Sequence, residues 1–106
     1  MKATYDIYID FVSWTGGGKS RPVLILNEGI DRIEVLGITS RFDDKSDCIR
    51  SQFFRINDWR QAGLHQESYI NTGQTVTLPR SAMERMVGAL SESDTKRLMK
   101  FLAERR

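Results

Sequence analysis

The chain has 106 residues, of which 40% are hydrophobic and 28% charged, a composition typical of soluble globular proteins. Two halves of a chain this short would each be too small to fold unaided, so a single domain spanning residues 1–106 is expected. The formal net charge of +2 is too small to indicate a general polyanion binder. No apolar run is long enough to span a bilayer, so no membrane association is expected.

Metal ligands and nucleophilic side chains are few. The single cysteine, Cys48, cannot form an intrachain disulfide, and its isolation suits a reducing cytoplasm, where we expect the protein. The single histidine, His65, stands without Cys, Asp or Glu at ligand spacing, so it is a poor metal site and is expected at the surface. We therefore predict no metal site and no cofactor.

The first part of the chain predicts three strands. Residues 4–12 alternate aspartate or aromatic side chains with aliphatic ones, which indicates a strand with one buried face. Residues 13–20 contain three consecutive glycines and predict a mobile loop. The apolar run at 21–26, a turn at 27–29 and a second alternating run at 32–39 then predict a hairpin.

Residues 40–51 mix charges of both signs with few apolar side chains, so they predict a long exposed loop. Ordered structure should resume at residues 52–56. Residues 57–63 predict a short internal helix that Asn57 caps and Gly63 ends.

The last part of the chain predicts strands followed by a terminal helix. Two short strands are expected at 68–71 and 74–79, while residues 84–90 fit either a strand or a helix and are assigned to a strand. Ser91 followed by Asp94 at capping spacing predicts a C-terminal helix to about Ala103, with Leu98 on its apolar face. The simplest architecture is a small β-barrel with a docked terminal helix.

A possible phosphate site lies at the mouth of the predicted hairpin. Arg21 follows the glycine-rich segment, and Thr39 and Ser40 stand at the far end of the partner strand, so all three should lie near the same open end. A guanidinium, two hydroxyls and backbone N–H groups of a glycine-rich loop together suit a phosphate group.

The ordered motifs of the chain resemble the MazF/PemK toxins of bacterial toxin–antitoxin systems. These motifs are IDF, a glycine-rich loop, SRPVLIL, GITS and YIN-x-x-Q-x-V-x-L-P before a capped terminal helix. The resemblance implies a mainly β, SH3-like barrel of the MazF/CcdB type, with a short internal helix and a C-terminal helix. It also implies a homodimer that cleaves single-stranded mRNA at short sequences and is silenced by a cognate antitoxin protein.

Carried over by position, the resemblance implies that Arg21 and Thr39 are the catalytic residues. The substrate-binding residues that we expect, in part from the resemblance, are Gly18, Lys19, Ser20, Ser40, Gln74 and Trp14. Trp14, in a polar loop, is expected to contact bases, because single-stranded RNA is read largely by stacking. Tyr8 is assigned to the core.

Metal-free cleavage of RNA requires the 2′-hydroxyl to attack phosphorus while one group accepts a proton and another donates one. Arg21 suits charge stabilisation, because a guanidinium in protein remains protonated and can hold phosphoryl oxygens bidentately. Family members often carry a histidine or glutamate before the RP motif and a carboxylate before the later glutamine. Here the first is missing and the second is Gly73, so the proton acceptor is unassigned, with Asp6 and Asp10 as distant candidates.

Two other functions remain open at this point. A CcdB-like gyrase poison on the same barrel would explain the missing histidine and carboxylate, but such relatives act through an apolar, aromatic tip of the terminal helix, and this chain ends AERR. A non-catalytic SH3-like RNA-binding module would retain RNA without cutting it.

Overall fold

The computed structural model describes residues 5–14, 17–40 and 51–104, of which 10–14 and 17–20 are described by their backbone alone. Six described strands form one antiparallel sheet in the order β4-β5-β3-β2-β1-β6. They are β1 (Asp6–Trp14), β2 (Gly17–Glu28), β3 (Arg32–Thr39), β4 (Phe53–Arg55), β5 (Tyr69–Pro79) and β6 (Met83–Ala89). A 3-10 turn, η1 (Arg80–Ala82), joins β5 to β6, and the helix α2 (Glu92–Glu104) follows.

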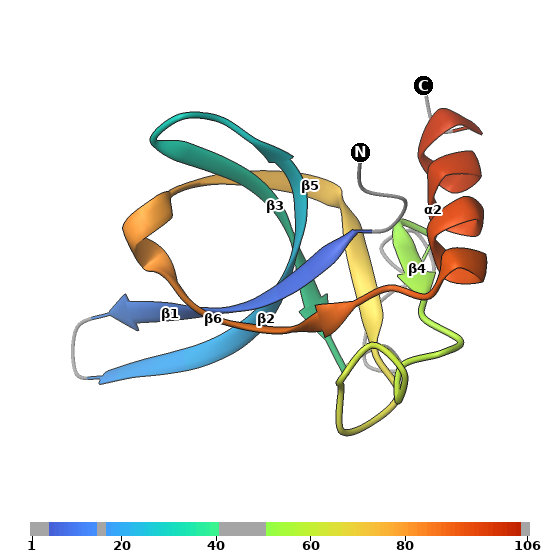
Figure 1. Ribbon diagram of the computed structural model, residues 1–106, viewed down its shortest axis with the longest axis horizontal. Coiled ribbons are helices and arrows are strands. Elements are labelled where there is room, and N and C mark those ends of the chain that lie inside the picture. Colours follow the sequence, from blue (N-terminus) through green and yellow to red (C-terminus); the bar gives the residue numbers. More distant parts are fainter. Residues whose placement is uncertain (1–4, 15–16, 41–50, 105–106) are drawn as a thin grey trace.

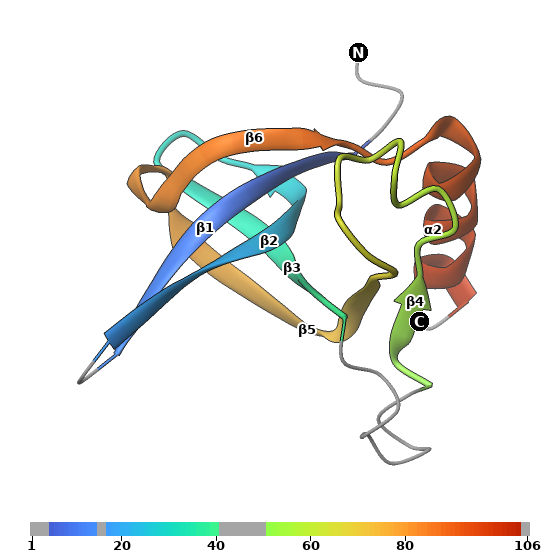
Figure 2. The same cartoon turned by 90° about the horizontal axis from the view of Figure 1, so that it is seen from below.

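The strands curve round into a barrel-like sheet, with α2 and β4 side by side at one end (Figure 1). The β1–β2 hairpin extends from the opposite end, as the turned view also shows (Figure 2). The mainly β architecture with a C-terminal helix, expected from the sequence, is confirmed.

Alternate residues of the central strands bury their side chains in two separate clusters. We call the first the helix-side core; it includes Leu24 and Leu36 of the sheet together with Leu98 of α2. The second, the groove-side cluster, consists of Val23, Ile25, Ile33 and Val35, with Tyr8, Leu78 and Met83 packed against it. Because successive side chains of a strand point to opposite faces, β2 and β3 contribute to both clusters. The prediction that Tyr8 is a packing residue is confirmed.

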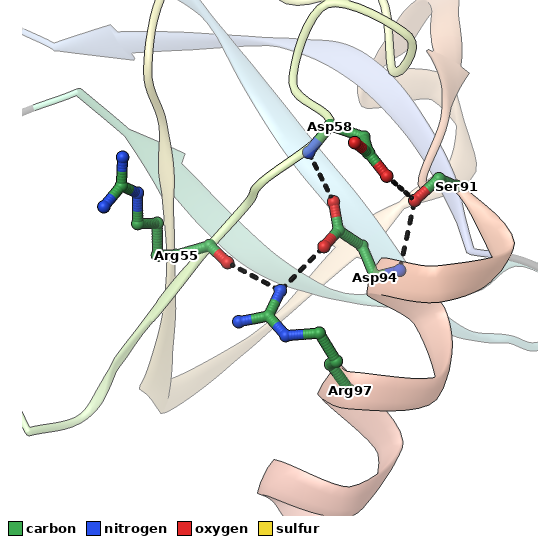
Figure 3. Close-up of polar contacts among 5 residues, drawn as sticks. All are labelled: Arg55, Asp58, Ser91, Asp94 and Arg97. Atoms are coloured by element: carbon green, nitrogen blue, oxygen red, sulfur yellow. Dashed lines mark hydrogen bonds and ion pairs between the residues drawn. The ribbon is translucent and has the colours of Figure 1, made fainter.

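The helix α2 is attached by apolar packing and by a polar network that Figure 3 shows. Ser91 Oγ accepts the Asp94 amide at 3.1 Å, which confirms Ser91 as the helix cap, and donates to Asp58 Oδ2 at 2.7 Å. The fully buried Asp94 carboxylate accepts the Asp58 amide at 2.8 Å and Arg97 Nη1 at 2.7 Å. Arg97 Nη1 also lies 3.4 Å from the Arg55 carbonyl oxygen. The helix N-terminus is therefore bound to the segment that follows β4.

The predicted internal helix at 57–63 is only one hydrogen-bonded turn. The Ala62 amide donates to the Asp58 carbonyl at 3.1 Å, and Gly63 then ends the turn with a positive φ of 91°. The Gly63 and Leu64 amides donate back to Arg60 and Trp59, the pattern of a Schellman helix end, so the predicted stop at Gly63 is confirmed. The predicted cap is off by one residue, because the Asp58 carbonyl accepts the first hydrogen bond of the turn, which puts Asp58 rather than Asn57 at the cap position.

Other predictions need correction at their boundaries. The glycine-rich segment is not wholly a loop, since β1 runs to Trp14 and β2 begins at Gly17, with these two residues paired. The two strands expected at 68–71 and 74–79 are one strand, β5, with an irregularity in its pairing. The ambiguous segment near Met86 is a strand, β6. The loop predicted at 40–51 lies mostly outside the described residues, as does Cys48.

Candidate functional site

The β2–β3 hairpin brings Arg21 and Thr39 to the same place. Its pairing runs through Leu24 opposite Leu36 to Val23 opposite Gly37. Arg21 and Thr39 each lie two residues beyond that last pair, so the alternation of side chains places both on the face of Val23 and Gly37. The register of the β2–β3 pairing thus explains why Arg21 and Thr39 lie close together, as the sequence predicts.

Both residues line one groove of about 460 Å³. Its other lining residues are Pro22, Val23, Val35, Gly37, Ile38, Phe53, Asn71, Val76 and Leu78. Arg21 is exposed and Thr39 partly buried, while Val23 and Val35 belong to the groove-side cluster. The groove therefore has an apolar floor with a cation, a hydroxyl and an amide at its edges, the usual character of a ligand-binding site.

Gly37 leaves room in the middle of this groove. A Cβ atom built at Gly37 would have no neighbouring heavy atom within 4 Å, so the space beside this strand is open. Because Gly37 lies on the same face of β3 as Val35 and Thr39, a side chain at this position would project into the groove. The glycine therefore widens the groove next to Thr39.

The remaining expected site residues are placed less completely. Ser40 directly follows Thr39 and is exposed, and Gln74 is exposed on the irregular part of β5 but does not line the groove. Trp14, Gly18, Lys19 and Ser20 lie toward the tip of the β1–β2 hairpin, and their side chains are outside the described part of the structure.

The two candidate proton acceptors are separated along β1. Asp10 pairs with Arg21 across the β1–β2 ladder. Asp6 is buried and pairs with Ala89 of β6, four residues along β1 from Asp10. Only Asp10 therefore has a backbone position next to the arginine.

Sequence reasoning did not single out Phe53 and Asn71. They face each other in the β4–β5 pairing and reach the groove because β5 pairs with β3 on its other side. The one sequence signal for Asn71 was its polar side chain at the end of the run SYIN. Phe53 could not be distinguished from its buried neighbour Phe54 without the register.

Outside this groove, a second hollow of about 490 Å³ lies at the 57–61 turn and contains none of the expected site residues. His65 is exposed, as predicted. Within residues 5–14, 17–40 and 51–104, no group of three His, Cys, Asp or Glu side chains could hold a metal ion. Among the same residues, no helix has the length and apolarity to cross a membrane.

Solved structures with a similar arrangement are bacterial toxins. Mycobacterium tuberculosis toxin MazF-mt6 superimposes with a TM-score of 0.67 at 22% sequence identity, over 92% of this chain and 93% of that one. The chain has the fold of the MazF toxins. A second M. tuberculosis toxin gives a TM-score of 0.67 at 22% identity, over 93% and 97% of the two chains.

An endoribonuclease in complex with its cognate antitoxin, from a mycobacterial species, has the same fold. It gives a TM-score of 0.70 at 12% identity, over 93% of this chain and 88% of that one. No family model matches the chain, and no curated protein sequence matches it. The likeness to the MazF fold is therefore one of structure at low sequence identity.

Proposed function

We propose that this protein is an endoribonuclease toxin of the MazF family, which cleaves single-stranded mRNA in the cytoplasm without a metal ion. The observation that carries the proposal is the meeting of Arg21 and Thr39 at one groove of a MazF-type fold. Both residues were expected in the site from sequence motifs alone. An endoribonuclease and two toxins with this fold support the activity.

Arg21 is proposed to bind and stabilise the reacting phosphate. Its exposed guanidinium can donate two parallel hydrogen bonds to phosphoryl oxygens, which gain negative charge as the 2′-oxygen attacks. Thr39 would hold the phosphate in orientation from the neighbouring strand, with Ser40 next to it. RNA bound over the apolar floor of the groove would displace water and so strengthen these interactions.

The reaction balances without any external reactant. The 2′-hydroxyl loses its proton and forms a bond to phosphorus, while the bond from phosphorus to the 5′-oxygen breaks and that oxygen gains a proton. The products are a 2′,3′-cyclic phosphate and a 5′-hydroxyl. We propose Asp10 as the proton acceptor, because its backbone pairs with that of Arg21, whereas Asp6 lies four residues away along β1 and precedes the first pair of the β1–β2 register.

The partners proposed are an antitoxin protein and a second copy of the chain. The structure of an endoribonuclease with its cognate antitoxin supports the first. The resemblance to the MazF/PemK toxins supports the second, together with the exposed apolar side chain of Met86, which does not line the groove. Sequence specificity is expected to depend on the groove and on the β1–β2 hairpin.

The purified protein incubated with a long single-stranded RNA in EDTA tests this function. We expect discrete fragments with 2′,3′-cyclic phosphate ends, and loss of those fragments with Arg21→Ala. Removing the 2′-hydroxyl at a mapped cleavage site should prevent cutting at that site alone. Intact RNA across many sequences would contradict the proposal, and gyrase-dependent DNA breaks in a parallel assay would favour the gyrase alternative.

A further inference from the structure

One stretch of β5 leaves the regular pairing beside the groove. On β3 the pairing advances from Leu36 to Ile38, two residues, while on β5 it moves from Thr75 to Ile70, five residues. Residues 71–74 are therefore displaced from the β3 ladder. On its other edge this stretch begins with Asn71 opposite Phe53 of β4, and both side chains line the groove.

The displaced stretch is fixed by the residue before β4. The Thr72 amide donates to the Gln52 carbonyl oxygen at 2.9 Å, and the Thr72 hydroxyl donates to the same oxygen. A Cβ atom at Gly73 would lie only 2.0 Å from Gln52 Oε1, so the Gln52 side chain occupies the space that a side chain at 73 would need. A side chain at position 73 would therefore require the end of the Gln52 side chain to move.

This arrangement also fixes the orientation of the Asn71 amide. The Gly73 backbone N–H donates to Asn71 Oδ1 at 3.0 Å, and because an N–H can only donate, the atom facing it must be the oxygen. The Nδ2 group is then directed away from Gly73 as a hydrogen-bond donor. Asn71 thus presents a donor at the groove that Arg21 and Thr39 also line.

We propose that Asn71 and Phe53 form a subsite for one nucleobase, next to the phosphate bound by Arg21 and Thr39. The Phe53 ring, half-buried in the groove wall, supplies a surface for stacking, and Asn71 Nδ2 donates to the base edge. A donor that faces the 4-position of a pyrimidine or the 6-position of a purine selects a carbonyl oxygen at that position, so uracil and guanine are preferred over cytosine and adenine, which carry an amino group there. This inference rests on the proposed function, because it assumes single-stranded RNA in the groove.

Reversing the donor tests the base preference directly. Binding is measured by fluorescence anisotropy with 2′-fluoro oligonucleotides, which lack the attacking hydroxyl, as the matched pairs oligo(U) with oligo(C) and oligo(I) with oligo(A). The wild-type protein should favour the carbonyl member of each pair by about fivefold, the value of one hydrogen bond. Asn71→Asp, which offers an acceptor instead, should favour the amino member, and Asn71→Ala should show no preference.

The stacking surface has its own pair of variants. Phe53→Leu should weaken binding of all four oligonucleotides by about tenfold, while Phe53→Tyr, which keeps the ring, should bind as the wild type does. Preferences that stay the same in both Asn71 variants would overturn the inference, as would equal binding by Phe53→Leu and Phe53→Tyr.

The two proposals fail in different ways. A wild-type protein that cuts long RNA but shows no carbonyl preference overturns the subsite alone. A wild-type protein that neither cuts long RNA nor binds any of the four oligonucleotides overturns the ribonuclease function and the subsite with it.

Discussion

The two faces of the β2–β3 hairpin are covered differently. Leu24 and Leu36 on one face are buried in the helix-side core together with Leu98 of α2, which is fully buried. On the other face, Val23 and Val35 form part of the floor of a groove that remains open beside Gly37. The same two strands therefore provide both the structural core and the candidate site.

The polar groups at the N-terminus of α2 and those at the groove also differ. In the first turn of α2, the buried Asp94 carboxylate accepts hydrogen bonds from the Asp58 amide and from Arg97, so its hydrogen bonds are made within the protein. At the groove, Arg21 is exposed and Asn71 Nδ2 is directed away from the bond that fixes its amide. Polar groups satisfied internally stabilise a fold, whereas donors at an open groove are available to a ligand.

The largest effect on stability is expected from Leu98→Ala. This change removes a fully buried side chain that connects α2 to the sheet, and it should lower the free energy of unfolding by about 3 kcal/mol. Met99→Ala on the same helix is the matched control, because Met99 is 56% exposed, and it should change stability by less than about 0.5 kcal/mol. Urea denaturation measures both. Equal losses in the two variants would contradict the assignment of the helix-side core.

Asp94→Ala should have the second largest effect, lowering the free energy of unfolding by about 2 kcal/mol. It leaves the partly buried Asp58 amide without its acceptor and removes the carboxylate partner of Arg97. Asp94→Asn keeps one acceptor oxygen and should lose about half as much. Glu92→Ala serves as control, since its ion pair with Lys96 is exposed and contributes little. A loss in Asp94→Ala no larger than that in Glu92→Ala, by the same denaturation, would refute the buried network.

Gly37→Val should have the smallest effect on stability and a large one on function. No atom lies within 4 Å of the added Cβ, and valine suits a strand, so unfolding should change by less than about 0.5 kcal/mol. The side chain should narrow the groove and reduce RNA cleavage at least tenfold, with Gly37→Ala intermediate. Cleavage at the wild-type rate by a folded Gly37→Val protein would show that RNA binds elsewhere.

Local signals in the sequence were sufficient for most elements. Alternation of side chains identified the strand at 32–39, and the cap at Ser91 and the stop at Gly63 were read from their neighbours in sequence. The motif around Arg21 and the strand ending at Thr39 indicated the site because both belong to one hairpin, whose register depends on residues close in the chain.

Contacts between distant segments could not be read in this way. The cap expected at Asn57 falls instead at Asp58, whose amide is bound by Asp94, far along the chain. Asn71 and Phe53 reach the groove only through the pairing of β4 and β3 with the two edges of β5. The closeness of the Gln52 side chain to Gly73 likewise depends on residues 21 positions apart in the chain.

The central claim is that Arg21 acts on RNA at the groove, and a matched pair of arginine variants tests it most directly. Cleavage rates of one RNA in EDTA are compared for Arg21→Ala and for Arg60→Ala, which removes the same charge beside Trp59 and outside the groove. The account predicts a loss of at least about 100-fold for Arg21→Ala and a rate within about twofold of wild type for Arg60→Ala, with both proteins folded. Equal rates for the two variants would contradict it.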